Sequence, residues 1–336
     1  MKHMIGLVLL WLGICSGSAV AELRAAPYRF SGPYQFENLA IYLVHGDDRY
    51  ERDNVITLAE ALKEKKAVLH ETGSVNSLSL ENLTQDHVIF VAAGTIVKGG
   101  QQDRVLSKDL VVLPGSGTVS IDAFCVEQGR WNARDEEPVD RFSSAAKQLN
   151  ARELKLAARK EKEQGKVWAE VAAVQEKLNS ALNARVRSTK SSTSLQLTLE
   201  HQALVTKIQS YQRALGQRAQ EQEDAIGYVF AINGELNSGD VFASRALFLK
   251  LWPTLLEAAA TEAAAETSAQ RAASLPTLDE VTQFIRMAET APITDRSHLG
   301  ATETSTRETD QAVVFESNAE TIGAIRKSFI KKKLPE

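Results

Sequence analysis

The composition of the chain changes abruptly at Arg141 and changes back near Glu223. Between these positions the sequence is rich in Ala, Lys, Glu, Gln, Arg and Leu and contains no proline, which is typical of helices. The flanking segments instead hold short β-forming runs that end at turn-forming residues. This order predicts an α+β fold with a strand-rich core from residues about 30–135 and 224–330 and a long helical hairpin, about 141–223, inserted between them. Two domains with a boundary near residue 140 are the alternative.

Two apolar stripes with three- and four-residue steps support the helical insertion. The stripes are Val171, Val174, Leu178 and Leu182, then Leu204, Ile208, Tyr211 and Leu215. A polar run, residues 188–194, separates them, so we expect two helices joined by a loop, packed as in a coiled coil. A disordered, charged linker is the alternative, and residues 151–166 fit either a solvated helix or a tail.

The sequence on either side of the helical segment predicts individual strands and helices. Strand-forming runs cover residues 39–44, 67–71, 87–93, 110–113, 119–126, 226–232 and 312–316. Asn233-Gly234 predicts a type I′ turn, because both of its positions tolerate positive φ. Helices are expected over residues 57–66, 244–252, 254–266 and from Thr277 to about Glu289, with Pro253 breaking or kinking the chain between the middle two.

The N-terminus has the pattern of a secretory signal peptide. Lys2 precedes an apolar run from Ile5 to Ile14, and Ala19-Val20-Ala21 matches a cleavage site. We therefore expect cleavage near Ala21 and a periplasmic or secreted protein. Ile14 stands before Cys15 where a lipidation signal needs a small residue, and beyond the signal no apolar stretch is long enough to span a membrane.

The composition limits which partners, cofactors and cross-links this chain is expected to have. A formal charge of −4 offers no broad cationic surface, so nucleic acid is not an expected partner. Removal of the signal leaves Cys125 as the only thiol and excludes an internal disulfide, so a hydrophobic core must supply stability. We find no metal-binding motif and expect neither a metal nor a cofactor; His45-Gly46-Asp47-Asp48 is more typical of a solvent-facing turn.

Residues 94–104 form the first cluster that could carry chemistry. Gly99 and Gly100 would let backbone amides approach an anion closely, beside Gln101. Lys98 would add charge, and Arg104 could clamp a carboxylate or phosphate. The ending required of a P-loop is missing, and a tight turn with polar decoration is the alternative.

Residues 125–131 form the second cluster. Cys125 and Glu127 would share one face of a strand, with Arg130 and Trp131 just beyond its end. Cys125 has no histidine nearby in sequence and is expected to be a core residue. Glu127 and Arg130 could be a structural ion pair or half of a polar site. Trp131 could stack on a sugar or base or pack into the core.

Three segments together resemble a known domain family. They are Lys98-Gly99-Gly100-Gln101-Gln102-Asp103-Arg104, Phe124-Cys125-Val126-Glu127-Gln128-Gly129-Arg130-Trp131 and Gly227-Tyr228-Val229-Phe230-Ala231-Ile232-Asn233-Gly234-Glu235. Their order and spacing resemble the family named for its association with ADP-ribosylglycohydrolases and the rhodanese-phosphatase superfamily, a family of unknown function. Residues 240–253 also fit it. The first segment differs from the usual lysine and asparagine around the glutamine, since Gln101 and Asp103 stand there.

Three functional hypotheses follow. The first is a binding module without catalytic activity for a small ligand or an envelope protein, with a pocket formed by Gly99, Gly100, Gln101, Arg104, Glu127, Arg130 and Trp131. The second is a hydrolase or transferase for a phosphate- or ADP-ribose-type compound, with Glu127 as general base. The third is a structural envelope-associated protein whose helices oligomerise. The first needs the two clusters to converge in space.

Overall fold

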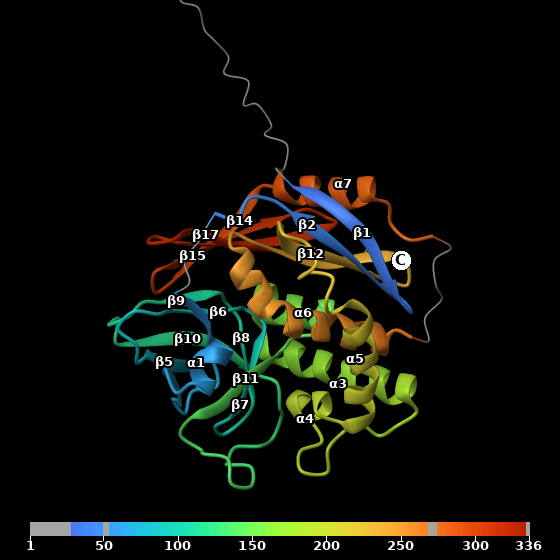
Figure 1. The fold of residues 1–336 in the computed structure, drawn as a ribbon. Coiled ribbons are helices and arrows are strands. Elements are labelled where there is room, and N and C mark those ends of the chain that lie inside the picture. Colours follow the sequence, from blue (N-terminus) through green and yellow to red (C-terminus); the bar gives the residue numbers. More distant parts are fainter. Residues whose placement is uncertain (1–27, 50–53, 268–273, 334–336) are drawn as a thin grey trace, which may run out of the picture.

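The computed structural model describes residues 28–49, 54–267 and 274–333 (Figure 1). The expected signal peptide, with its cleavage site at Ala21, lies outside these residues. No helix in the described ranges is both long and apolar enough to cross a membrane.

An eight-stranded antiparallel sheet forms one layer of the molecule. It combines strands from both ends of the chain in the order β1-β2-β12-β13-β17-β16-β15-β14. Their bounds are β1 (Arg29–Phe36), β2 (Leu39–His45), β12 (Ala225–Ile232), β13 (Glu235–Phe242), β14 (Ile293–Leu299), β15 (Thr302–Glu308), β16 (Ala312–Ala319) and β17 (Gly323–Lys331). The sheet pairs β2 directly with β12, which joins the two strand-rich flanks of the sequence.

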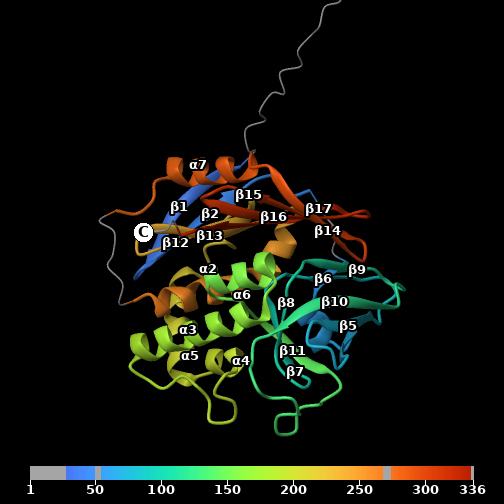
Figure 2. The same cartoon turned by 180° about the vertical axis from the view of Figure 1, so that it is seen from behind.

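Two smaller sheets lie together beside the helices (Figures 1 and 2). The six-stranded sheet has the order β11-β7-β8-β10-β5-β4, and the three-stranded sheet has the order β3-β6-β9. Their bounds are β3 (Val55–Thr57), β4 (Ala67–Glu71), β5 (Ser77–Asn82), β6 (Val88–Val91), β7 (Thr95–Gly99), β8 (Arg104–Leu106), β9 (Leu110–Val112), β10 (Thr118–Cys125) and β11 (Phe142–Gln148). Their alternate apolar side chains, with those of α1 (Leu58–Lys63), form a separate buried cluster.

Helices cover both faces of the large sheet. Helix α7 (Leu278–Glu289) packs Val281, Phe284 and Ile285 on one face, and α6 (Arg245–Ala265) lies on the other. Figure 1 shows α3 (Gln164–Leu182), α4 (Leu195–Leu199) and α5 (Gln202–Leu215) beyond α6. The helix α2 (Arg152–Leu156) continues into a π-helical turn (Ala157–Glu161).

Several sequence expectations are confirmed and others need correction. The fold is α+β and strand-rich, and Asn233-Gly234 has the two positive φ values, 54° and 86°, of the expected turn. The predicted helical block, however, begins with strand β11. A long helical hairpin is not shown, since α3 and α5 both pack against α6 and α4 lies between them in the chain.

Helix α6 runs through Pro253, where the sequence suggested a break. Proline removes one backbone hydrogen bond, but Trp252, Leu255 and Leu256 on both sides of it are buried against the core. Tertiary packing therefore holds the helix continuous across the proline.

Candidate functional site

The turn between β7 and β8 contains the two glycines of the first cluster. Gly99 has φ +125° and Gly100 has φ +57°, a region that favours glycine. A Cβ on Gly100 would lie 2.7 Å from the Phe142 ring and 2.8 Å from Oε2 of Glu71. Both backbone conformation and close packing therefore require glycine at this position.

The backbone amides of this turn hold anions, as the sequence suggested, but the anions are the protein's own. The Gly99 N–H donates to Oδ1 of Asp103 at 3.2 Å, and the Gln101 N–H donates to Oε2 of Glu71 at 3.2 Å. The Gly100 N–H donates to the Arg141 carbonyl. Internal partners thus occupy all three donors in this structure.

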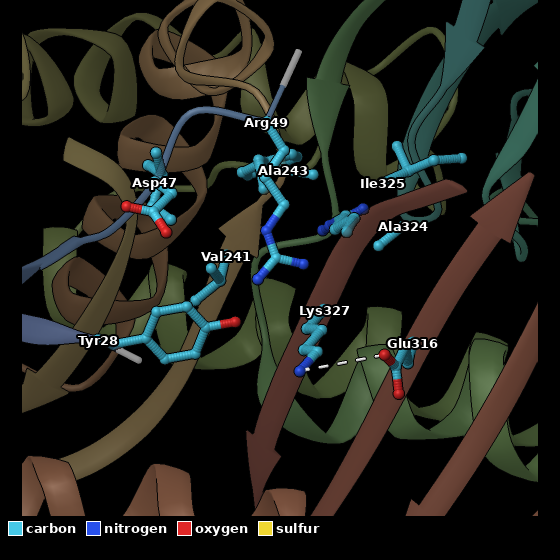
Figure 3. Close-up of a pocket in the computed structure, with 12 residues that line it drawn as sticks. Tyr28, Asp47, Arg49, Val241, Ala243, Glu316, Ala324, Ile325 and Lys327 are labelled. Carbon is cyan, nitrogen blue, oxygen red and sulfur yellow. Dashed lines mark ion pairs between the residues drawn. The ribbon is translucent and has the colours of Figure 1, made fainter. Parts of the chain in front are cut away.

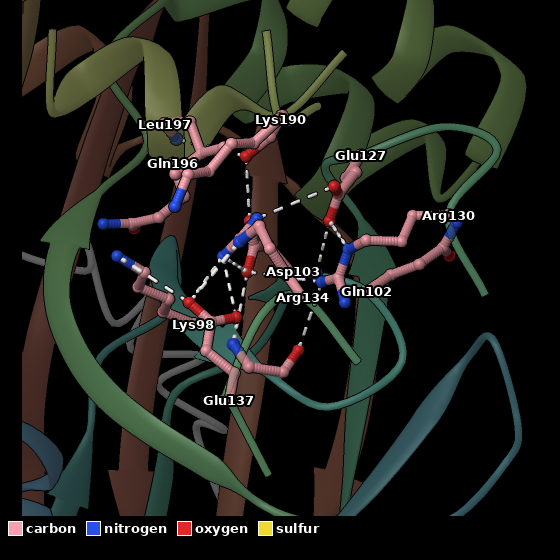
Figure 4. A network of polar contacts seen from close by, with 12 residues as sticks. Lys98, Gln102, Asp103, Glu127, Arg130, Arg134, Glu137, Lys190, Gln196 and Leu197 are labelled. Carbon is pink, nitrogen blue, oxygen red and sulfur yellow. Dashed lines mark hydrogen bonds and ion pairs between the residues drawn. The ribbon is translucent and has the colours of Figure 1, made fainter. Parts of the chain in front are cut away.

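The second cluster lies directly against this turn. Arg130 donates from Nε to Oε2 of Glu127 at 2.8 Å and from Nη1 to the Gly100 carbonyl at 3.1 Å (Figure 4). Glu127 is fully buried and also accepts a hydrogen bond from the Asp103 N–H at 3.2 Å. The two sequence clusters therefore converge in space, and Glu127 with Arg130 is a buried ion pair.

Asp103 is the centre of the network, although the sequence did not single it out. Its carboxylate takes two hydrogen bonds from Arg134, at 2.9 and 3.1 Å, and one from the Ser194 hydroxyl at 2.8 Å. Burial lowers the pKa of Arg134, but the hydrogen bond and charge of Asp103 outweigh burial and raise it overall. Arg134 is therefore a permanent cation fixed in the interior.

Arg104 and Trp131 lie on the other side of the turn. The Arg104 guanidinium is fully buried; it donates to the Gln102 carbonyl at 3.1 Å and lies 3.5 Å from Oε2 of Glu71. The Trp131 ring lies over it, 5.5 Å from ring centre to guanidinium carbon, and is 47 % exposed. Among the predicted ligand residues, only Trp131 presents a large surface to solvent; the Oε1 atom of Gln101 is buried and has no hydrogen-bond partner among the described residues.

The candidate nucleophile and the candidate base are both poorly placed for catalysis. Cys125 is buried, and that burial raises the pKa of its thiol, which disfavours the reactive thiolate. The Glu127 carboxylate is enclosed by Arg130 and by Arg134, whose Nη1 lies 3.6 Å from Oε1. Its Oε1 accepts no hydrogen bond from the described residues, but the side chain is fully buried, and a general base needs to reach a substrate proton.

Several members of the network escaped the sequence analysis. They are Glu71, Gln102, Asp103, Arg134, Glu137 and Ser194, from four separate segments of the chain. Asp103 lies inside the first motif and Arg134 three residues after the second, so charged residues flanking the glycines were the available signal. Their pairing depends on long-range contacts that spacing does not encode.

An open groove of about 760 Å³ lies above the network, between the segments 128–135 and 185–193. Two hydrogen bonds between the Gln128 backbone and the Thr193 hydroxyl, 3.1 and 2.7 Å long, join its walls, and Lys190 forms an ion pair with Asp135. The charged side chains that line it are Arg130, Arg134, Asp135, Arg185 and Lys190. The buried ion pairs of Arg130 and Arg134 therefore form part of the wall of a solvent-accessible cleft.

A second cavity, of about 140 Å³, lies between the segment 46–49 and strands β13 and β17 (Figure 3). Its cations are Lys327, which is 2.6 Å from Glu289 and 4.0 Å from Glu316, Arg326, which pairs with Asp240, and Arg49, for which the described residues provide no ion pair. In the described ranges no group of three or more potential metal ligands occurs. The groove is several times larger than this cavity and adjoins the network of the two motifs, so it is the better candidate site.

Comparison with known proteins agrees with the resemblance of the motifs. The sequence model of the ARG and Rhodanese-Phosphatase-superfamily-associated Protein domain matches residues 27–326. No curated protein and no solved structure matches the chain significantly. The matched range contains the glycine turn, the Glu127–Arg130 pair and both walls of the groove. The chain therefore belongs to the ARG and Rhodanese-Phosphatase-superfamily-associated Protein domain family.

Proposed function

We propose that this protein is a binding module whose groove holds a small polar ligand with an anionic group. The observation that carries the proposal is the lining of the groove. One wall supplies the hydroxyl side chains of Ser188, Thr189, Ser191 and Ser192 next to the exposed Arg185, while the Thr193 hydroxyl is held by the Gln128 backbone. Hydroxyls and guanidinium groups are the donors that recognise phosphate, carboxylate and sugar oxygens.

Arg185 is the side chain best suited to contact such a ligand. Within the described part of the chain it makes no ion pair and no side-chain hydrogen bond, whereas Arg130 and Arg134 are held from behind by Asp103 and Glu127. The buried network supports the wall of the groove and leaves Arg185 available. Because the wall is already ordered before a ligand binds, less conformational entropy is lost on binding.

A hydrolase or transferase acting through Glu127 has less support. Its carboxylate already accepts hydrogen bonds from Arg130 and from the Asp103 backbone. A phosphate- or ADP-ribose-type compound would suit the same groove as a ligand without being turned over. An envelope-associated structural role, with an envelope protein as partner, draws support only from the helical layer α3–α6 and from the expected export of the chain after cleavage near Ala21.

The test is a thermal-shift screen of the chain from Glu22 onward, with ADP-ribose, NAD, inorganic phosphate, sugars and cell-wall fragments as probes. A probe at about 100 times its Kd should stabilise the folded state by roughly 2.7 kcal/mol. We expect that stabilisation to be lost in Arg185→Ala, which removes the available guanidinium. Arg213→Ala, an exposed arginine on α5 outside the groove, is the matched control and should keep it.

The outcomes separate the hypotheses. A shift that disappears in Arg185→Ala and survives in Arg213→Ala supports the groove. A shift that survives in both variants, or no shift with any probe, contradicts the proposal and directs attention to a protein partner. Turnover of a stabilising probe that is abolished by Glu127→Gln would favour the enzyme hypothesis instead.

A further inference from the structure

A second cluster of charge lies far from the groove in sequence, where α2 and its π-helical turn contact the large sheet. The chain brings Lys155 of α2 and Arg159 of the π-helical turn to Arg326 of β17 and Asp240 of β13 around one small cavity. The cavity volume is about 20 Å³. None of these residues belongs to the glycine turn or the Asp103 network.

Arg326 pairs with Asp240, which lines this cavity, and with Asp109, which lies outside its lining. Its Nη2 lies 2.8 Å from Oδ1 of Asp240, and its Nη1 lies 3.0 Å from Oδ1 of Asp109. The Asp109 carboxylate also accepts hydrogen bonds from the Ala93 N–H at 2.6 Å and from the Ser317 hydroxyl at 2.7 Å. One cation is therefore matched by two acids.

Arg159 has no carboxylate in direct contact among the described residues, although the charges of Asp109 and Asp240 act on it from further away. Its side chain is buried, its Nη1 donates one hydrogen bond of 2.8 Å to the Ser328 hydroxyl, and its Nε has no partner within the described residues. No carboxylate of the described residues lies within ion-pair distance of its guanidinium. The guanidinium lies over the Phe315 ring at 4.2 Å, and burial lowers its pKa to about 10.

Lys155, four residues earlier on α2, is half-buried and has no partner in direct contact either. Its ammonium forms neither an ion pair nor a hydrogen bond with the residues the structure describes, and it lies 5.4 Å from the centre of the Phe230 ring. Burial lowers its pKa, and the charges of Glu262 and Asp240 oppose that effect from further away. The Glu262 carboxylate accepts hydrogen bonds from Asn237 and from the Arg152 N–H, and burial raises its pKa.

Two neighbouring cations without a direct counter-charge are costly in an interior unless an anion joins them. The cavity exceeds the roughly 10–15 Å³ that one water molecule needs, so it suits a single small ion. We propose that the cavity is a halide site, in which one chloride-sized monatomic anion lies between the Lys155 ammonium and the Arg159 guanidinium. This site is independent of the proposed groove.

Two experiments on the full folded chain test the proposal. Crystals soaked in sodium bromide should show one anomalous bromine peak in this cavity, in contact with Lys155 and Arg159. In solution, the Tm should rise saturably with sodium chloride relative to sodium gluconate at equal ionic strength. Lys155→Met should lose both signals and should melt no lower than the parent chain in gluconate, since an uncompensated charge is gone.

Lys160→Met is the matched control, because Lys160 is on the same turn but pairs with Glu308 outside the cavity. It should keep the bromide peak and the chloride-dependent shift. Arg159→Gln should lose the shift as well, and it provides a second test if Lys155→Met does not fold. A water molecule with no bromine peak, equal melting in chloride and gluconate, or a peak without stabilisation in solution would overturn the proposal.

Discussion

Asp103 shows how a single residue can determine whether a motif forms an anion-binding site or an internal ion-pair network. Its two carboxylate oxygens receive the Gly99 amide, both amino groups of Arg134 and the Ser194 hydroxyl. The glycine turn and the arginines would form an anion site if this carboxylate were absent. Because Asp103 is present, the same groups form a closed internal network, and under the proposed function a ligand would contact the side chains above it instead.

Asp103→Asn should therefore destabilise the fold strongly. The amide keeps the shape of the side chain but leaves the buried Arg134 without its main counter-charge, a change that costs about 3–5 kcal/mol in comparable buried pairs. Urea unfolding at neutral pH measures this loss. Asp135→Asn, which removes an exposed partner of Lys190, should leave the unfolding midpoint unchanged. Equal midpoints for the parent chain and Asp103→Asn would contradict the structural role of the network.

At the scale of elements, the hairpin β12–β13 depends on close backbone contact. A Cβ on Gly227 would lie 2.3 Å from the Asp240 carbonyl, and one on Gly239 would lie 2.5 Å from the Tyr228 carbonyl. The central strands of the large sheet can therefore pair only where these side chains are missing. A Cβ on Gly165, at the start of α3, would instead meet only Oε1 of Glu163 at 3.8 Å, an ordinary contact.

These two environments predict opposite effects of one substitution. Gly227→Ala should destabilise the chain by several kcal/mol or prevent folding, because backbone atoms cannot move away without breaking strand pairing. Gly165→Ala should raise stability by about 0.5–1 kcal/mol, because alanine loses less entropy in a helix. Differential scanning calorimetry of the two variants provides the measurement. A stable Gly227→Ala protein would show that the hairpin is looser than described.

Helices and strands were predicted correctly from the sequence where local residue patterns determine them, and less well where tertiary contacts do. The strand of residues 225–232, its Asn-Gly turn and the capped helix from Leu278 follow from β-forming residues, positive φ and a capping box. Strand β11 was missed because its residues, Phe142–Gln148, resemble the helix-forming segment that follows, and only pairing with β7 makes them a strand. The site follows the same rule: motif glycines and Arg130 were visible, whereas their pairing with Asp103 depends on tertiary contacts.

At the scale of the whole molecule, buried polar contacts join the large sheet to the smaller sheets. Arg326 of β17 contacts Asp109, which precedes β9, and donates to the Ala93 carbonyl at 3.2 Å. Next to them, the Thr302 hydroxyl of β15 accepts a hydrogen bond from the Val111 N–H at 2.8 Å. Apolar packing alone would permit sliding at this boundary, whereas fixed donors and acceptors specify one arrangement.

The junction should make stability depend on pH with a predictable sign. Burial raises the pKa of Asp109, but the charges of Arg326 and Arg159 and the Ala93 N–H outweigh burial and lower it overall. The contribution of Asp109 to stability is therefore complete above the unfolded pKa of about 3.9 and is lost as the pH falls through the folded value. Glu262 has the opposite sign, because burial raises its pKa and its ionisation opposes folding as the pH rises above about 4.3.

Urea midpoints measured from pH 3 to pH 8 test both signs together. Asp109→Asn should be less stable than the parent chain at neutral pH, and the difference should shrink as the pH falls below about 4, where the parent carboxyl also becomes neutral. Glu262→Gln should match the parent at low pH and gain on it as the pH rises, because only the parent must ionise a buried acid. A constant difference across the pH range for Asp109→Asn would mean that Arg326 does not depend on the carboxylate charge, and the boundary between the sheets would then be held by packing and by hydrogen bonds such as that of Thr302.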